Sequence, residues 1–372
     1  RVRDSIDASP EVAPRKILAA IEAALLLPID AGLAFEDAAA EDCADTQQSK
    51  ALSHVFHAEQ VVSAQVRRND LPEITTIGVL GGSAAARQIV LAALEARIAV
   101  NWLIKNPDQQ HDSLAHIKTV LQQSAQTGRI SREIVTWARQ NLRSSDNAEI
   151  LTGSNIVLRA TRGQRGVAIP ADTPVAHCLP GSDPRLAMQF AEPASSSRLV
   201  EVVLGPQATT DDRRIGLALA RCLNKLALVE TPSDLPLFDR LTQTLWRASD
   251  ALADLGQSPF TIDAAMHDWG MVLPPYRLAD RAGLDLVSRQ HRAEGCANWS
   301  ELLIQNGRQG LANRQGFYRY APEAEPDADQ EILHKIMERR APQANMAPED
   351  IRCCLIGAMT NTGAKALRDG TV

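Results

Sequence analysis

Apolar residues recur at helical spacing over residues 14–67, in two groups on either side of Pro28 and Gly32. They are Ile17, Ile21, Ala24, Leu25, Leu52, Val55, Phe56, Val62 and Val66. Positions three and four apart share one face of a helix, so each group predicts an amphipathic helix. We expect two helices at the start of the chain, joined across Pro28 and Gly32.

The pattern changes at residues 74–80, a short run with β-branched residues that ends at Gly81 and Gly82. A helix-like segment follows at residues 84–96, and a second apolar run at residues 98–104. Two strands that flank a glycine turn and a helix are typical of a dinucleotide-binding unit, whose strands are parallel. The sequence therefore predicts a Rossmann-type α/β domain.

Further strands and helices follow this unit. Helical spacing returns at residues 112–141, and apolar runs at residues 156–158, 167–169 and 199–204 predict strands. We place the end of this first domain near Pro232.

The rest of the chain has a helical pattern. Leucine and alanine recur at steps of three and four from Leu237 to Leu252, so a helical domain begins there. Residues 321–329 are rich in proline and acidic residues and predict an exposed linker. A third helical segment is expected over residues 330–372.

Composition and charge exclude several classes of protein. The 372 residues carry a net charge of −6, which disfavours a general nucleic-acid binder. The longest apolar stretches, residues 17–29 and 89–104, are interrupted by polar residues and fall short of the roughly 20 apolar residues of a membrane span. Six cysteines without CxxC spacing indicate a reducing compartment, which we take to be the cytoplasm. Residue 1 is Arg, so we expect the chain to be part of a longer protein.

Five motifs, in order along the chain, resemble one family. They are residues 27–36 with 51–59, Ile77 to Gly82, Arg198 to Val203, Pro274 to Asp285, and Gly316-Phe317-Tyr318. The family is the 3-hydroxyacyl-CoA dehydrogenase portion of the multifunctional fatty-acid β-oxidation proteins, which include the fatty oxidation complex alpha subunit and its peroxisomal relatives. The first motif is similar to the linker helix after the hydratase domain, the second to the NAD-binding turn, and the third to the strand after the catalytic histidine. The fourth and fifth are similar to the GPFxLxDxxGLD and GKGFY signatures.

The resemblance implies an organisation and an activity. Residues 1–69 would be the helical linker after a missing enoyl-CoA hydratase domain, and residues 70–232 the Rossmann-like domain. Residues 233–325 and 326–372 would be a first helical C-domain and part of a second. The implied reaction oxidises (3S)-3-hydroxyacyl-CoA to 3-oxoacyl-CoA with NAD⁺. The implied partners are acyl-CoA and a thiolase subunit, and an oligomer is possible.

The cofactor turn departs from the family pattern. The glycines of G-x-G-x-x-G allow a tight turn, close approach to the pyrophosphate and close packing of the helix. Here Gly81 keeps the first glycine position and Gly82 follows it, while Ser83 and Ala86 replace the second and third glycines, so we expect weakened NAD binding. Lys105 stands where the family has a ribose-binding carboxylate. It is either a partner for the 2′-phosphate of NADP or a solvated lysine at a strand end.

The catalytic positions depart further. In the family a histidine lies twelve positions before the strand glutamate and is the base for the hydroxyl proton. Counting back from Glu201 gives Gln189, and an amide cannot accept that proton near neutral pH. Asp239 replaces the family's substrate-contacting asparagine, and residues 167–170 replace its serine segment without a hydroxyl. Asp239 would face Glu201, or would lie on the surface at a helix start.

Three hypotheses about function remain open at this point. The first is a working dehydrogenase whose base comes from elsewhere, such as His177, although we expect the redox step to be impaired. Alternatively it is a non-catalytic module that binds acyl-CoA or holds hydratase and thiolase partners in place. A third, weaker hypothesis is a CoA-ester enzyme that uses Glu201 and Asp239 for a different proton transfer. No metal site is expected.

Overall fold

An eight-stranded sheet forms the centre of the computed structural model. The structure describes residues 6, 11–161, 166–179, 185–191, 193–232, 235–290, 298–321, 324–331, 334, 338 and 346–372. Within these residues the strand order is β3-β2-β1-β4-β5-β6-β7-β8, and only the β6–β7 pair is antiparallel. The strands are β1 Thr76–Leu80, β2 Ala99–Leu103, β3 Leu142–Ser145, β4 Ile156–Arg159, β5 Val175–His177, β6 Leu186–Phe190, β7 Leu199–Leu204 and β8 Leu226–Glu230.

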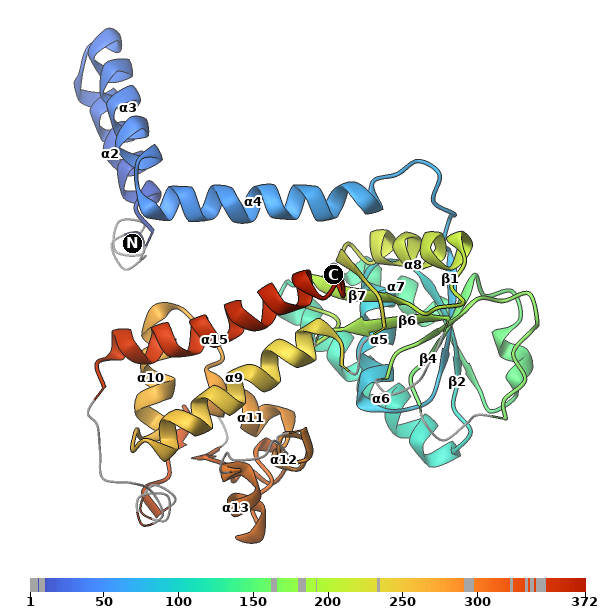
Figure 1. Cartoon of the computed structure of the whole chain (residues 1–372). Coiled ribbons are helices and arrows are strands. Elements are labelled where there is room, and N and C mark those ends of the chain that lie inside the picture. Colours follow the sequence, from blue (N-terminus) through green and yellow to red (C-terminus); the bar gives the residue numbers. More distant parts are fainter. Residues whose placement is uncertain are drawn as a thin grey trace.

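Helices pack on this sheet and bury its hydrophobic side chains (Figure 1). They are α5 Ala84–Glu95, α6 Pro107–Gln126, α7 Arg132–Asn141, the 3₁₀ helix η1 Ala148–Leu151 and α8 Thr210–Cys222. The side chains of Ile77, Val79 and Trp102 are fully buried, as is Ala86 at the start of α5. The parallel β1-α5-β2 unit predicted from the glycine turn is present.

The predictions for the later strands are only partly confirmed. Residues 156–158 lie in β4 and residues 199–204 are β7, whereas Val167 to Ile169 form no strand. The apolar side chains of Val167 and Ile169 pack on a small cluster around Leu151 and Val157. Their backbone does not pair with a neighbouring strand. The apolar residues at 167–169 therefore indicated burial, and both a strand and a packed loop can be buried. Strands β3, β5, β6 and β8 were not predicted.

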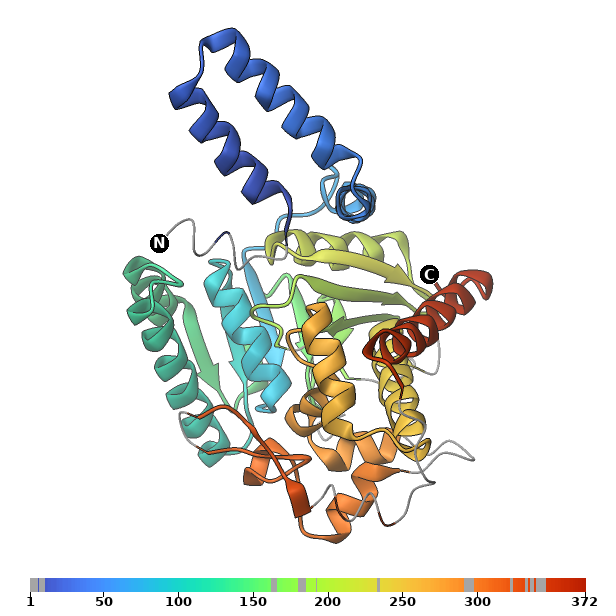
Figure 2. The ribbon, with the colours of Figure 1, turned by 90° about the vertical axis from the view of Figure 1, so that its left-hand side faces the viewer.

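The N-terminal region is an arm of three helices, α2 Ala13–Leu26, α3 Ile29–Ala44 and α4 Gln47–Val66. The prediction of two helices was wrong. Pro28 begins α3, and the next break falls at Thr46, whose hydroxyl caps α4 by accepting from the Ser49 amide at 3.1 Å. Helices α2 and α3 stand away from the rest of the molecule (Figures 1 and 2). Leu25 and Leu26 on α2 remain 82% and 83% exposed.

The second domain is helical, as expected, with a small two-stranded sheet. Its elements are α9 Leu237–Asp254, α10 Pro259–Trp269, α11 Pro275–Ala282, α12 Leu284–Gln290, α13 Trp299–Gln305, the 3₁₀ helix η2 Leu311–Asn313, β9 Tyr318–Arg319, β10 Asp327–Ala328 and α15 Pro348–Arg368. Helix α15 packs along α9 (Figure 1). Ile351 and Leu355 of α15 belong to the same hydrophobic core as Leu245 and Trp246 of α9.

The expected exposed linker is wrong at its C-terminal end. Asp327 and Ala328 pair with β9, and Asp329 is only 3% exposed. The Asp329 carboxylate binds Arg308 and Arg319, each at 2.6 Å. Two arginines offset the desolvation of this acid, so an acidic composition did not indicate exposure here.

In the described part of the chain, none of the helices combines the length and apolar character that a membrane span requires.

Candidate active site

The glycine turn between β1 and α5 has a backbone that requires glycine at one position. Gly81 has a φ of +111°, and a Cβ there would lie 2.7 Å from the side chain of Thr161. The Gly81 carbonyl accepts a hydrogen bond from Trp102 Nε1 at 2.7 Å, from the fully buried indole on β2. The turn is therefore held tightly between the ends of two strands.

Ser83 is the N-cap of α5. Its hydroxyl oxygen accepts from the Ala86 amide at 3.1 Å, and the hydroxyl donates to the Ala160 carbonyl at 2.9 Å. Amides at a helix N-terminus are the groups that hold a phosphate in dinucleotide-binding turns. Because Ser83 engages one of these amides, fewer remain for a cofactor.

The side chain of Gln109, in the first turn of α6, occupies the space in front of Gly82. A Cβ placed on Gly82 would lie 2.6 Å from Gln109 Cδ. Gly82 lies directly before Ser83, the residue at the second glycine position, where the pyrophosphate approaches the backbone in a working turn. The turn is therefore closed rather than an open cradle; it is formed by Gly81, Gly82, Ser83 and Ala86. NAD does not fit this site unless the Gln109 side chain moves.

Lys105 follows β2, where the family pattern has its ribose-binding acid. Its ammonium group donates to the backbone carbonyl of Asp146 at 2.7 Å, and the side chain is exposed. This bond ties Lys105 to the end of β3, which fits a strand-end lysine more simply than a phosphate ligand.

Gln189 and Glu201 are directly opposite each other in the antiparallel β6–β7 pair. Opposed residues in such a pair project from the same face of the sheet. The twelve-residue separation inferred from sequence therefore corresponds to a true cross-strand pair. Gln189 is half-buried, whereas Glu201 is only 2% exposed.

Glu201 has a second acidic neighbour that the sequence analysis did not identify. Glu230, at the end of β8, pairs in register with Val203 and therefore shares a face with Glu201 two residues away. The two carboxyl groups are within hydrogen-bonding reach of each other. Alternation along β8 could have indicated this contact, but only once β7 was known to be its neighbour.

The same two carboxyl groups cap the start of α9, which has no capping side chain of its own. Glu201 Oε1 accepts from the Phe238 amide at 2.5 Å, and Glu230 Oε2 accepts from the Leu237 amide at 3.3 Å. These bonds join the sheet to the first turn of the helical domain. Asp239, in that same turn, adds a third negative charge near both glutamates.

Burial, reinforced by the charge of Glu230, raises the pKa of Glu201 to about 8. Burial also raises the pKa of Glu230. Two close carboxylates cannot both be ionised cheaply, so one proton is held between them near neutral pH.

His177, the alternative base, is the last residue of β5. It pairs in register with Arg159 and Ala187, so it shares a sheet face with Gln189 but lies one strand away and two residues back. Strand spacing places its Cα about 8 Å from that of Gln189 and about 12 Å from that of Glu201. Burial and the Arg159 charge lower the pKa of His177. The imidazole is thus neutral, but too distant to form a dyad with Glu201.

The signature residues of the helical domain have a structural role. Asp280 accepts from the amides of Phe317 and Tyr318, at 2.8 and 3.0 Å, and from the Tyr320 hydroxyl at 2.9 Å. A Cβ on Gly316 would overlap the Asp280 carboxylate. The two motifs singled out in sequence, around residues 280 and 316, therefore meet at one buried carboxyl group.

Asp263 on α10 anchors the same region from the other side. It accepts from the amides of Tyr276 and Arg277, at 2.9 and 3.1 Å, and from the Tyr318 hydroxyl at 2.9 Å. Burial raises the pKa of Asp263 to about 7 and that of Asp280 to about 6. Within the described residues, no group of three or more potential ligands could hold a metal ion.

Comparison with known proteins agrees with these motifs. Residues 237–320 match the C-terminal domain of 3-hydroxyacyl-CoA dehydrogenase. The fatty acid oxidation complex subunit alpha of Psychrobacter arcticus is 24% identical over 342 residues, which cover 83% of this chain and 48% of that protein. The human peroxisomal bifunctional enzyme is 20% identical over 349 residues, 81% of this chain and 48% of that protein. The chain is related to the 3-hydroxyacyl-CoA dehydrogenases.

Solved structures give the fold of this dehydrogenase-like module independently. The dehydrogenase part of multifunctional enzyme 1 from C. elegans superposes with a TM-score of 0.62 at 15% identity, covering 84% of this chain and 82% of that one. The (S)-3-hydroxybutyryl-CoA dehydrogenase from Ralstonia eutropha gives 0.59 at 19% identity, covering 67% and 100%. A Rossmann-type domain followed by helical C-domain material is thereby confirmed. The chain spans about half or less of the length of the curated relatives it matches.

Proposed function

We propose that this chain is a 3-hydroxyacyl-CoA dehydrogenase-like module of fatty-acid β-oxidation whose redox step is weak or absent. The related reaction oxidises (3S)-3-hydroxyacyl-CoA to 3-oxoacyl-CoA with NAD⁺. The observation that carries the proposal is the cross-strand pairing of Gln189 with Glu201. It supports the assignment of Gln189 to the position of the missing base.

The two residues lack the properties that the proton transfer needs. The Gln189 amide can donate a hydrogen bond to a substrate carbonyl, but it cannot take a proton from a hydroxyl group. Glu201 is protonated near neutral pH because its pKa is about 8. A glutamate that supports a histidine base must be ionised to stabilise the imidazolium. Restoring the base alone would therefore restore only part of the function.

The cofactor proposed for this module is NAD, bound weakly. The helix α5 N-terminus still offers amides and a partial positive charge for a pyrophosphate. Gln109 occupies the space in front of Gly82, and Ser83 engages the Ala86 amide, so each competes with a bound cofactor. NADP is the alternative, through Lys105, and the bond from Lys105 to Asp146 argues for NAD.

The direct test is to mix the purified chain with acetoacetyl-CoA and NADH and to follow the nicotinamide absorbance. We expect turnover far below that of an ordinary dehydrogenase of this family, measured in parallel. Comparable turnover would refute the impaired-site proposal. Separate titrations with NAD⁺ and NADP⁺ then decide the cofactor, and a clear preference for NADP⁺ would assign Lys105 to the 2′-phosphate.

A second candidate is a non-catalytic module that binds acyl-CoA or holds hydratase and thiolase partners in the cytoplasm. The exposed apolar side chains of the α2–α4 arm favour this role, because exposed patches of this kind mark interaction sites. Binding of acyl-CoA without turnover would support it. If neither acyl-CoA nor a nucleotide binds, only a structural role in an assembly remains.

A further inference from the structure

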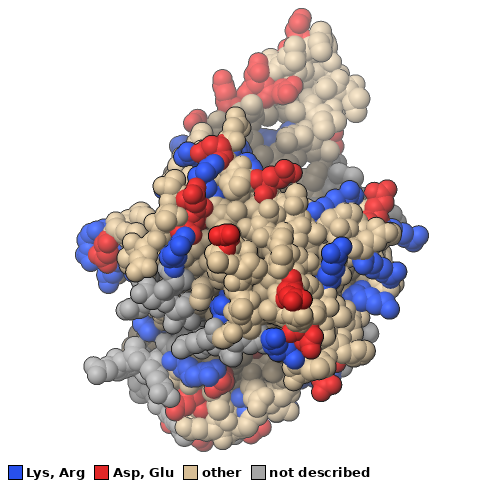
Figure 3. All heavy atoms as spheres, turned by 90° about the vertical axis from the view of Figure 1, so that its right-hand side faces the viewer, with Lys and Arg blue, Asp and Glu red and all other residues tan. Residues whose placement is uncertain are grey.

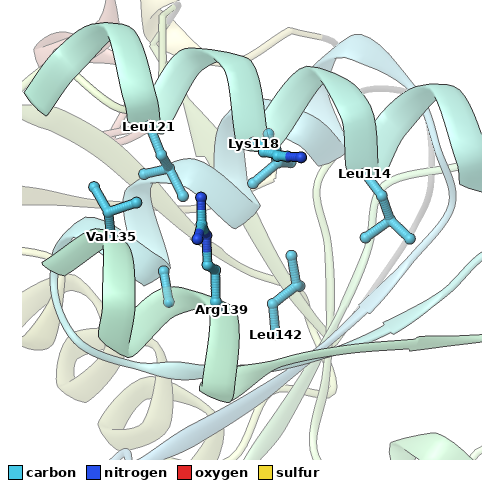
Figure 4. A pocket seen from close by; sticks show the side chains of 8 residues that line it. Leu114, Lys118, Leu121, Val135, Arg139 and Leu142 are labelled. Carbon is cyan, nitrogen blue, oxygen red and sulfur yellow. The ribbon is translucent and has the colours of Figure 1, made fainter. Parts of the chain in front are cut away.

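A cavity of about 370 Å³ lies between α6 and α7. Leu114, Lys118 and Leu121 project into it from α6, and Val135 and Arg139 from α7 (Figure 4). A helix rises about 1.5 Å per residue, so Lys118 lies about 13 Å along α6 from Gln109 at the glycine turn. The cavity is therefore a separate site from the candidate active site.

The walls of the cavity are aliphatic. They are formed by Leu114, Ile117, Leu121, Val135, Ala138 and Leu142. Ile117, Leu121 and Ala138 are at most 3% exposed and belong to the main hydrophobic core, so they form a fixed floor. Water in such a space finds few hydrogen-bond partners, so an aliphatic group that displaces it gains free energy.

Two cations border this apolar space. Lys118 and Arg139 are exposed, and in the part of the chain that the structure describes neither forms an ion pair or a side-chain hydrogen bond. In Figure 4 the Arg139 side chain reaches across the gap toward α6, while Lys118 projects from α6 between Leu121 and Leu114. A ligand with one anionic end would meet both charges without displacing an existing partner.

The surrounding charge favours an anion as well. Residues 107–143 contain five basic and three acidic residues, although the whole chain has a net charge of −6. Basic side chains gather along one flank of the face shown in Figure 3. The residues that line the cavity include Lys118 and Arg139 and no acidic side chain, so an anionic group is attracted there.

We propose that this cavity binds an aliphatic monocarboxylate, with its chain between α6 and α7 and its carboxylate between Lys118 and Arg139. The volume is at the lower end of the range of about 300–1,000 Å³ for small-molecule sites, which suits a single alkyl chain better than a nucleotide. A membrane lipid carries the same combination of alkyl chain and anionic head. The free acid is the ligand proposed here, because the aliphatic floor is enclosed between two helices.

The test is calorimetric titration of the full chain with octanoate. We expect saturable binding of one octanoate per chain, weaker binding of octan-1-ol, and no binding of octyltrimethylammonium or acetate. The double variant Lys118→Glu with Arg139→Glu should weaken octanoate binding by about tenfold or more, since it replaces attraction by repulsion. The matched control, Arg132→Glu with Arg143→Glu, changes the net charge equally at positions outside the cavity lining and should leave binding within about twofold.

Several outcomes would overturn the proposal. They are no saturable octanoate binding, equal binding of octan-1-ol, equal loss in both double variants, or sedimentation with anionic phospholipid vesicles that octanoate does not compete. Circular dichroism of both double variants establishes that they are folded. Val135→Phe, which fills the cavity without changing charge, should abolish octanoate binding, and unchanged binding in this variant would also contradict the assignment.

Discussion

Glu201 and Glu230 place their carboxyl groups together beneath the first turn of α9, and each accepts a backbone amide of that turn. One acidic pair therefore both joins the two domains and determines the protonation state of the candidate catalytic glutamate.

The free energy of unfolding should fall as pH rises through neutrality. The pKa of Glu201 is about 8 in the folded protein and near 4.5 when unfolded, so the folded state binds the proton more tightly. Stability from this group is fully present below about pH 4.5 and is lost progressively up to about pH 8, by about 2–4 kcal/mol at most. Urea unfolding at pH 6 and pH 9 measures it. In Glu201→Gln the difference should shrink but not vanish, because burial also raises the pKa of Asp263 to about 7 and that of Asp250 to about 8. An unchanged difference would show that Glu201 does not contribute.

Replacing Gln189 by histidine should increase dehydrogenase turnover. The imidazole would lie opposite Glu201 and supply the missing base, which contributes about tenfold or more even in an imperfect site. Because Glu201 is ionised only above pH 8, the gain should grow as the pH is raised toward 9. The kcat for NAD⁺ reduction with (3S)-3-hydroxybutyryl-CoA is the measurement, because only in this direction does the histidine act as a base. Gln189→Asn is the control and should remain at the wild-type level.

Removing the Gln109 side chain should strengthen NAD⁺ binding. The side chain occupies the space in front of Gly82, so NAD⁺ binds only in the fraction of molecules in which it has moved. We expect the Kd for NAD⁺ to fall by about threefold or more in Gln109→Ala. Gln122→Ala, an exposed glutamine on the same helix, should have no effect. An equal response in both variants would mean that the change does not act at the turn.

Asp280→Asn should destabilise the helical domain. The buried carboxyl group accepts three hydrogen bonds through its two oxygens. The asparagine amide has only one oxygen, so its NH₂ group would face a donor. A loss of about 2–4 kcal/mol in unfolding free energy is expected for a broken buried network. Asp285→Asn, at an exposed residue paired with Arg289, should cost less than about 0.5 kcal/mol. Denaturant unfolding of the two variants compares them directly.

The sequence determined the parts of this protein that depend on local pattern. The β1-α5-β2 unit followed from a short apolar run, a glycine pair and a helical segment, which are contiguous in the chain. Strand β7 followed from its apolar run, and the count from Glu201 to Gln189 identified residues that proved to be paired. Two of the five motifs that resemble one family lie around Asp280 and Gly316, which the fold brings to one buried contact.

Tertiary structure decided the contacts between residues far apart in the chain. Glu230 meets Glu201 only because β8 lies beside β7, and Gln109 covers Gly82 only because α6 begins next to the turn. Asp329 is buried because two arginines from other segments neutralise it. Periodicity and composition report the local preference of each segment, whereas a pKa, a closed cradle or a buried ion pair depends on which distant groups folding places within a few ångströms.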